Sequence, residues 1–122
     1  MITSKEKNDC SVVALANATG KSYEDCHLLL KSMGRGDGCT VWSNIVAAAC
    51  LREGGKINLF AIDYREQYLT PKRTFSRYAP YLKSGNFVVI TQHHVFCVKD
   101  GAILDENKVA DDEEVVSVYY FK

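Results

Sequence analysis

The sequence predicts an α+β fold, in which helices from the first half of the chain pack on an antiparallel β-sheet from the second half. Two observations lead to this prediction. The first half contains segments with helical start and stop signals, whereas the second half contains short runs rich in β-branched and aromatic residues, separated by turn residues. Helices followed by strands is an order typical of α+β domains. The 122 residues are expected to form a single domain, residues 1–122.

The first predicted helix covers residues 10–19. Its side chains are apolar almost all round, and such a helix is usually buried on several sides. Asn8 or Asp9 is expected to cap its first turn, because both residue types accept hydrogen bonds from the free N–H groups there. Gly20 then supplies the left-handed residue that ends the helix.

Two further helices are predicted before residue 55. Ser22 and Asp25 resemble a capping box at the start of the second helix, which runs from there to the flexible, glycine-rich loop 34–38. Thr40 is expected to cap the third helix, over residues 41–52. The third helix is predicted to bury one apolar stripe, made of Trp42, Ile45, Val46, Ala49 and Cys50.

After residue 55 the apolar residues alternate with a period of two, which predicts strands. The predicted strands cover residues 56–62, 87–91, 93–99, 102–105 and 115–121. The run 87–91 is almost entirely apolar, which indicates a central strand. Asp100-Gly101 predicts a tight hairpin turn. The other segments are expected to be an irregular stretch at 63–72, a short helix at 74–83 that Pro80 ends or kinks, and a polar, mostly acidic loop at 106–114.

Composition and charge exclude several classes of function. The formal net charge is zero, so no basic footprint for nucleic acid or an anionic membrane is indicated. No apolar run approaches the roughly 20 residues that span a bilayer. The charged segment 1–7 is not followed by the apolar stretch of a signal peptide. A cytoplasmic protein is therefore expected. The 5 cysteines, an odd number without a Cys-x-x-Cys pair, indicate free thiols. Neither a metal nor a cofactor is expected.

Cys10 is the candidate nucleophile. It stands at the first turn of the predicted helix 10–19, where unpaired backbone N–H groups gather partial positive charge. Such an environment lowers the pKa of a thiol and stabilises an oxyanion, so the Cys10 N–H is an expected oxyanion donor. A carboxylate beside the thiol, such as that of Asp9, acts in the opposite direction.

A nucleophilic thiol needs a base, and the base needs an orienting partner. If Asp100-Gly101 forms a two-residue turn, His94 lies diagonally across the hairpin from Asp105, and His93 lies diagonally from Glu106 on the other face. Apart from Asp105, the residues that share the His94 face are apolar: Phe96, Val98 and Ile103. A core-facing side has that character, so His94 is preferred to His93 as the base, with Asp105 as its orienting acid. A shift of one residue in register would reverse the choice.

Together these residues resemble the papain-like cysteine peptidases. Asn8-Asp9-Cys10 with its helix, and the late run 94–101, are similar to the small bacteriocin-processing (double-glycine leader) peptidases and to short bacterial and phage proteins with the same core. The resemblance implies a papain-like fold in which the Cys begins a central helix, the His begins a strand, and an Asp or Asn follows on the next strand. Leader peptidases usually carry a Gln six residues before the Cys. Ser4 stands there in this chain, which leaves Asn8 and Gln92 as candidates for the second oxyanion donor.

The expected function is thiol-dependent hydrolysis of a peptide or protein substrate by a triad of Cys10, His94 and Asp105. The same constellation serves amidases, isopeptidases and acyl transferases, so these reactions stay open. The second hypothesis is a papain-like binding or inhibitory module of phage origin whose site is vestigial. The absence of the upstream Gln and the small size of the chain favour this alternative.

Overall fold

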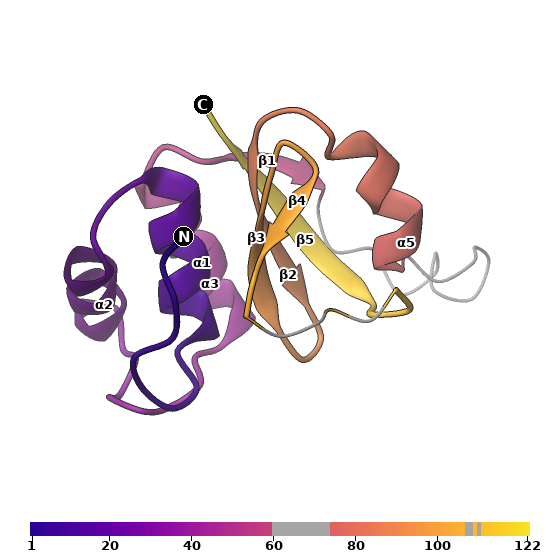
Figure 1. The fold of residues 1–122 in the computed structure, drawn as a ribbon. Helices are drawn as coiled ribbons and strands as arrows, with labels where there is room; N and C mark the ends of the chain where they lie inside the picture. Colours follow the sequence, from indigo (N-terminus) through magenta and orange to yellow (C-terminus); the bar gives the residue numbers. More distant parts are fainter. Residues whose placement is uncertain (60–73, 107–108, 110) are drawn as a thin grey trace.

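The computed structural model describes residues 1–59, 74–106, 109 and 111–122. These residues form an α+β structure, as predicted, with helices on both faces of one antiparallel sheet (Figure 1). In chain order its elements are α1 (Cys10–Thr19), α2 (Tyr23–Ser32), α3 (Ser43–Arg52), β1 (Lys56–Leu59), α5 (Phe75–Tyr78), the 3-10 helix η1 (Ala79–Tyr81), β2 (Asn86–Thr91), β3 (Val95–Lys99), β4 (Ala102–Leu104) and β5 (Val115–Phe121).

The five described strands follow the order β1-β5-β2-β3-β4, and all neighbours are antiparallel. The apolar strand β2 is therefore central, as its composition predicts. β5, the last strand of the chain, lies between β1 and β2, which ties the C-terminal segment into the middle of the sheet. In the hairpin of β3 and β4, Lys99 pairs with Ala102 and Cys97 with Leu104, the register expected from the Asp-Gly turn.

The sheet is buried on both faces. Helices α1 to α3 cover one face, and the residues that the sheet contributes to this first core are Val88, Ile90, Cys97, Tyr119 and Phe121. The segment around α5 covers the opposite face (Figure 1). This second core contains Phe75, Leu82, Phe87, Val89, Phe96, Val98, Val109, Val115 and Val118. Strand β2 supplies alternate residues to the two cores, which explains its continuous apolar run.

The first two helices begin and end largely as predicted. Gly20 has a positive φ of 76°, and its N–H donates to the carbonyl of Ala16 at 3.0 Å. The hydroxyl of Ser22 accepts a hydrogen bond from the backbone N–H of Asp25 at the start of α2. The predicted side-chain cap of α1 is wrong, because Asp9 occupies the N-cap position without capping and Asn8 donates its side-chain amide to Gly38.

The third helix starts later than predicted. It begins at Ser43, and its N-cap residue is Trp42 rather than Thr40, with an extended backbone (φ −60°, ψ 142°). The side chain of Trp42 is 80% exposed, so its assignment to the buried stripe is wrong, whereas Val46 and Ala49 are buried as expected. The reason is positional: a residue that precedes the first turn does not share the helical period of the residues that follow it.

The second half differs from the prediction mainly at its element ends. Strand β3 begins at Val95, so His93 and His94 lie in the turn before it, and Asp105 follows the end of β4. The predicted helix 74–83 is a short α-helix followed by a 3-10 turn that contains Pro80. Residues 60–62 of the first predicted strand and the predicted irregular stretch 63–72 lie outside the described residues. So do residues 107, 108 and 110 of the acidic loop.

Among the helices of the described residues, none combines the length and the apolar character that a membrane span requires.

The close approach of α3 to β5 yields a stability prediction. A Cβ on Gly55 would lie 2.7 Å from the Cys50 carbonyl oxygen and 2.8 Å from the ring of Phe121. We therefore expect Gly55→Ala to lower the free energy of unfolding by about 1–3 kcal/mol in urea denaturation. Gly36→Ala is the control, because its Cβ would meet the Cys39 sulfur at an ordinary 3.4 Å. Equal stabilities of the two variants would contradict this packing.

Candidate active site

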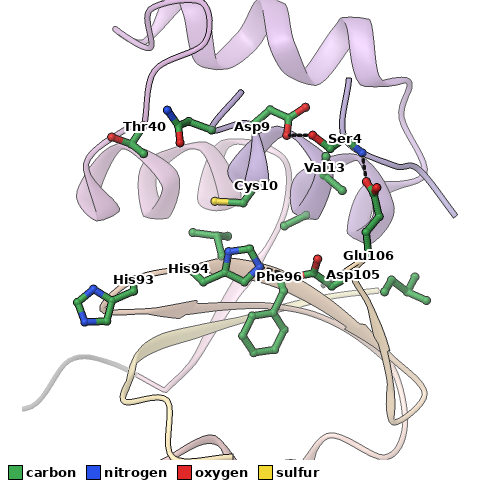
Figure 2. A pocket seen from close by; sticks show the side chains of 14 residues that line it. Ser4, Asp9, Cys10, Val13, Thr40, His93, His94, Phe96, Asp105 and Glu106 are labelled. Atoms are coloured by element: carbon green, nitrogen blue, oxygen red, sulfur yellow. Dashed lines mark hydrogen bonds and ion pairs between the residues drawn. The ribbon is translucent and has the colours of Figure 1, made fainter. Parts of the chain in front are cut away.

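The three residues predicted to act together come from three separate elements. Cys10 is the first residue of α1, His94 ends the turn between β2 and β3, and Asp105 follows β4. Figure 2 shows the imidazole of His94 between the Cys10 side chain on one side and Asp105 on the other. The fold thus brings the predicted thiol, imidazole and carboxylate into one site.

His94 contacts both of its predicted partners. Its Nε2 forms a hydrogen-bonded ion pair with Oδ2 of Asp105, and its ring stacks on Phe96 with the centroids 5.9 Å apart. The hydrogen bond with Cys10 raises the pKa of His94 to about 9, against the effect of partial burial and with support from Asp105. Because Nε2 is engaged by Asp105, Nδ1 is the ring nitrogen that remains for the sulfur.

The sheet face used to choose His94 is not the face that α1 covers. Phe96 and Val98 belong to the second core, on the α5 side, and Ile103 is 37% exposed. The apolar character of this face therefore does not explain why His94 meets Cys10. His94 precedes β3, and its imidazole is directed toward Cys10 from the end of the hairpin (Figure 2).

The turn that carries His94 is fixed by hydrogen bonds. The Thr91 N–H donates to the His94 carbonyl at 2.8 Å, and the His94 N–H donates to the Thr91 hydroxyl at 3.0 Å. The carboxylate of Glu113 accepts from the Thr91 hydroxyl at 2.7 Å and from the His93 N–H at 3.3 Å. Glu113 thus joins the loop before β5 to the turn, and we infer that it helps to position the imidazole of His94.

The other histidine of the pair does not form the contact expected of a base. His93 is exposed, and Figure 2 shows its ring directed away from Cys10. Glu106, its expected diagonal partner, instead accepts a hydrogen bond from the backbone N–H of Ser4. The geometry therefore favours His94 over His93 as the partner of the thiol.

The carboxylate of Asp9 is directed away from the thiol. It accepts hydrogen bonds from the hydroxyls of Ser4 (2.6 Å) and Tyr23 (2.7 Å), and from the backbone N–H groups of Lys5 (2.8 Å) and Glu6 (3.1 Å). Burial of Asp9 opposes its ionisation, but these four bonds prevail, and its pKa is lowered. Through these hydrogen bonds, the carboxylate of Asp9 fixes the segment that precedes α1.

A second buried charge holds the same segment. The side chain of Arg35 is fully buried, and it donates to the Glu6 carboxylate at 2.7 Å and to the Asn8 carbonyl at 3.1 Å. The bond from Arg35 is the main cause of the lowered pKa of Glu6. Arg35 therefore attaches the loop after α2 to the residues that lead into Cys10.

The candidate oxyanion donors differ in their surroundings. The side-chain amide of Asn8 donates to the Gly38 carbonyl at 3.1 Å, whereas Gln92 is exposed at the tip of the turn before His94. The N-cap residue Asp9 makes no side-chain cap on α1, and the Cys10 N–H stands in the first turn, where the helix end carries partial positive charge.

Two cavities adjoin Cys10 and His94. Their volumes are about 260 Å³ and about 530 Å³. Both are lined by Asn8, Cys10, Thr40, His93, His94 and Val95. The smaller cavity continues toward Asp105 and Glu106, and the larger one toward Trp42 and Gln92. An elongated ligand can thus lie on both sides of Cys10 and His94.

The remaining cysteines are unlike Cys10. Cys26, Cys50 and Cys97 are buried, and burial raises the pKa of all three thiols, to about 12 for Cys50 and Cys97. Cys39 is exposed and directly follows the glycine-rich loop 34–38. In the part of the chain that the structure describes, no three His, Cys, Asp or Glu side chains are grouped so that they could hold a metal ion.

Sequence reasoning missed the residues that support the site. The sequence predicts a flexible loop around Arg35 and a polar, mostly acidic loop around Glu113, because both segments are polar and rich in turn residues. Long-range contacts such as theirs leave no local pattern in a sequence. The one available signal was Thr91, whose residue type commonly bonds to the backbone within a turn.

The buried ion pair of Arg35 yields a second stability prediction. Arg35→Met should lower the free energy of unfolding by about 1–3 kcal/mol, since Glu6 and the Asn8 carbonyl lose their donor. Lys31→Met is the matched control, because the Lys31–Asp37 pair lies at the surface and is worth little. Urea denaturation measures both, and an equal loss in the two variants would contradict the role given to Arg35.

The contacts of His94 predict its titration. In a pH titration followed by NMR, its ring should titrate with a pKa near 9. In the Cys10→Ala variant the pKa should fall toward the ordinary 6.5, because the largest raising contact is lost. A His94 pKa near 6.5 in the unaltered protein would show that the contact with Cys10 is absent.

Comparison with known proteins adds no identification. No protein-family model, no curated protein and no solved structure matches the chain. What the site does must therefore be argued from its own residues.

Proposed function

We propose that the protein is a papain-like cysteine peptidase that acts on peptide or protein substrates, with Cys10 as nucleophile, His94 as base and Asp105 as orienting acid. The observation that carries this proposal is the arrangement around His94. Asp105 engages one ring nitrogen, and the hydrogen bond with Cys10 raises the pKa of the ring to about 9. An imidazole that contacts a thiol on one side and a carboxylate on the other is the arrangement that thiol acyl transfer requires.

In the proposed reaction each group has one role. His94 takes the thiol proton, and the resulting thiolate forms a bond from the Cys10 sulfur to the carbonyl carbon of the substrate. The negative charge passes to the carbonyl oxygen, which the N–H of Cys10 and a second donor, Asn8 or Gln92, stabilise. His94 then protonates the leaving amine as the C–N bond breaks, and a thioester remains on Cys10.

The second half of the reaction restores the site. The neutral His94 takes a proton from water, whose oxygen attacks the thioester carbon. The carbon–sulfur bond breaks, the acid product leaves, and the sulfur recovers the proton from His94. Asp105 keeps the imidazole oriented throughout and stabilises its protonated form. With an amine in place of water, the same steps give acyl transfer.

Alkylation of the thiols tests the proposal. With iodoacetamide at neutral pH, Cys10 should be labelled faster than the other four cysteines, because a protonated imidazole beside the sulfur stabilises the reactive thiolate. His94→Ala should slow the labelling of Cys10 about tenfold or more. Peptide mapping by mass spectrometry gives the rate at each thiol.

Two controls make the test specific. His93→Ala removes the neighbouring histidine and should leave the rate at Cys10 within about twofold, since its ring is directed away from the sulfur. Cys39, which is exposed, reports the reactivity of an ordinary accessible thiol. If Cys10 and Cys39 react equally fast and His94→Ala changes neither rate, the binding or inhibitory module becomes the better account.

A further inference from the structure

Trp42 has an unusual place for a tryptophan. It is 80% exposed, although a tryptophan carries one of the largest apolar surfaces of any side chain. It also lines the larger cavity, which Cys10 and His94 line as well. A single exposed apolar residue is ordinary, but one on the wall of a cavity beside a reactive pair is suited to contact a ligand.

The backbone around Trp42 holds it in place. Its carbonyl accepts hydrogen bonds from the N–H groups of Ile45 at 3.0 Å and Val46 at 3.3 Å, which start α3. Val46 is buried in the first core, and Val41, on the other side of Trp42, packs against that core. The backbone that carries the ring is therefore anchored, so little backbone entropy is lost when a ligand packs against the ring.

The charges around the two cavities differ. No Asp, Glu, Lys or Arg is among the described residues that line the larger cavity, whereas Asp9, Asp105 and Glu106 line the smaller one. The larger cavity adds the apolar side chains of Val41, Ile90 and Val116 to that of Trp42. Its volume of about 530 Å³ falls within the range of ligand pockets, and that of the smaller cavity, about 260 Å³, falls just below it.

We propose that the larger cavity is a subsite that receives a bulky, uncharged apolar side chain of a peptide, such as Phe or Leu, with Trp42 as its wall. Under the proposed function, this peptide is the substrate, and the apolar side chain lies close to the bond that Cys10 attacks. An ionised side chain would lose hydration in this cavity, and the charge on His94, which also lines it, is already paired with Asp105, so the subsite disfavours Asp and Lys.

Peptide binding to the full chain tests the subsite separately from catalysis. The probes are acetyl-Ala-Ala-X-Ala-Ala-amide peptides in which X is Phe, Leu, Ala, Asp or Lys, titrated into the Cys10→Ala variant by calorimetry. The Phe and Leu peptides should bind about tenfold or more tightly than the Asp and Lys peptides. They should also change the fluorescence of the protein, whose 1 tryptophan is Trp42.

Substitutions in the same background locate the effect. Trp42→Ala should weaken binding of the Phe peptide about tenfold and reduce the preference for apolar X. Tyr81→Ala is the control, because Tyr81 is an aromatic residue of similar exposure, 78%, that lines neither cavity. Equal affinity for all five peptides, or no effect of Trp42→Ala, would overturn the subsite. A preference for apolar X in a protein whose Cys10 is unreactive would support the subsite and reject the peptidase.

Discussion

The contact between the start of α1 and the turn at the end of β2 is the constraint on which the site depends. Cys10 is the first residue of its helix, and His94 ends its turn, so a small shift of either element would separate them. The position of α1 is set by apolar packing on the sheet through residues such as Leu15 and Val12, both fully buried. The core thus determines where the sulfur lies relative to the imidazole.

Polar contacts further fix the segment before Cys10 and the turn that carries His94. Asp9 and Arg35 are buried charges that hold the segment before Cys10, and Glu113 holds the turn before β3. Burying a charge is costly unless it is paired and hydrogen-bonded, and Asp9 and Arg35 each bond to several partners. Such contacts restrict the orientation of the groups that they hold. Cys10 and His94 are therefore both supported from outside the apolar core.

The sequence was a good guide where a local pattern determines the structure. Helix α1, the central strand and the Asp-Gly hairpin follow from periodicity and turn chemistry, and the hairpin register led to the pair of His94 and Asp105. It was a poor guide where structure depends on distant contacts. The sheet order, with β5 between β1 and β2, and the burial of Arg35 have no local signal. The sequence misplaces Trp42 because it predicts the start of α3 two residues before Ser43.

The contact between Cys10 and His94 is proposed to make the Cys10 sulfur a nucleophile toward a carbonyl carbon. Acylation of the thiol tests this proposal. The protein is incubated with 4-nitrophenyl acetate, quenched at intervals and examined by intact-mass and peptide mass spectrometry. We expect an acetyl thioester on Cys10 that forms rapidly and then hydrolyses, and whose formation is strongly slowed in His94→Ala. Acetyl groups spread over lysines, with none on Cys10 and no difference between the two proteins, would contradict it.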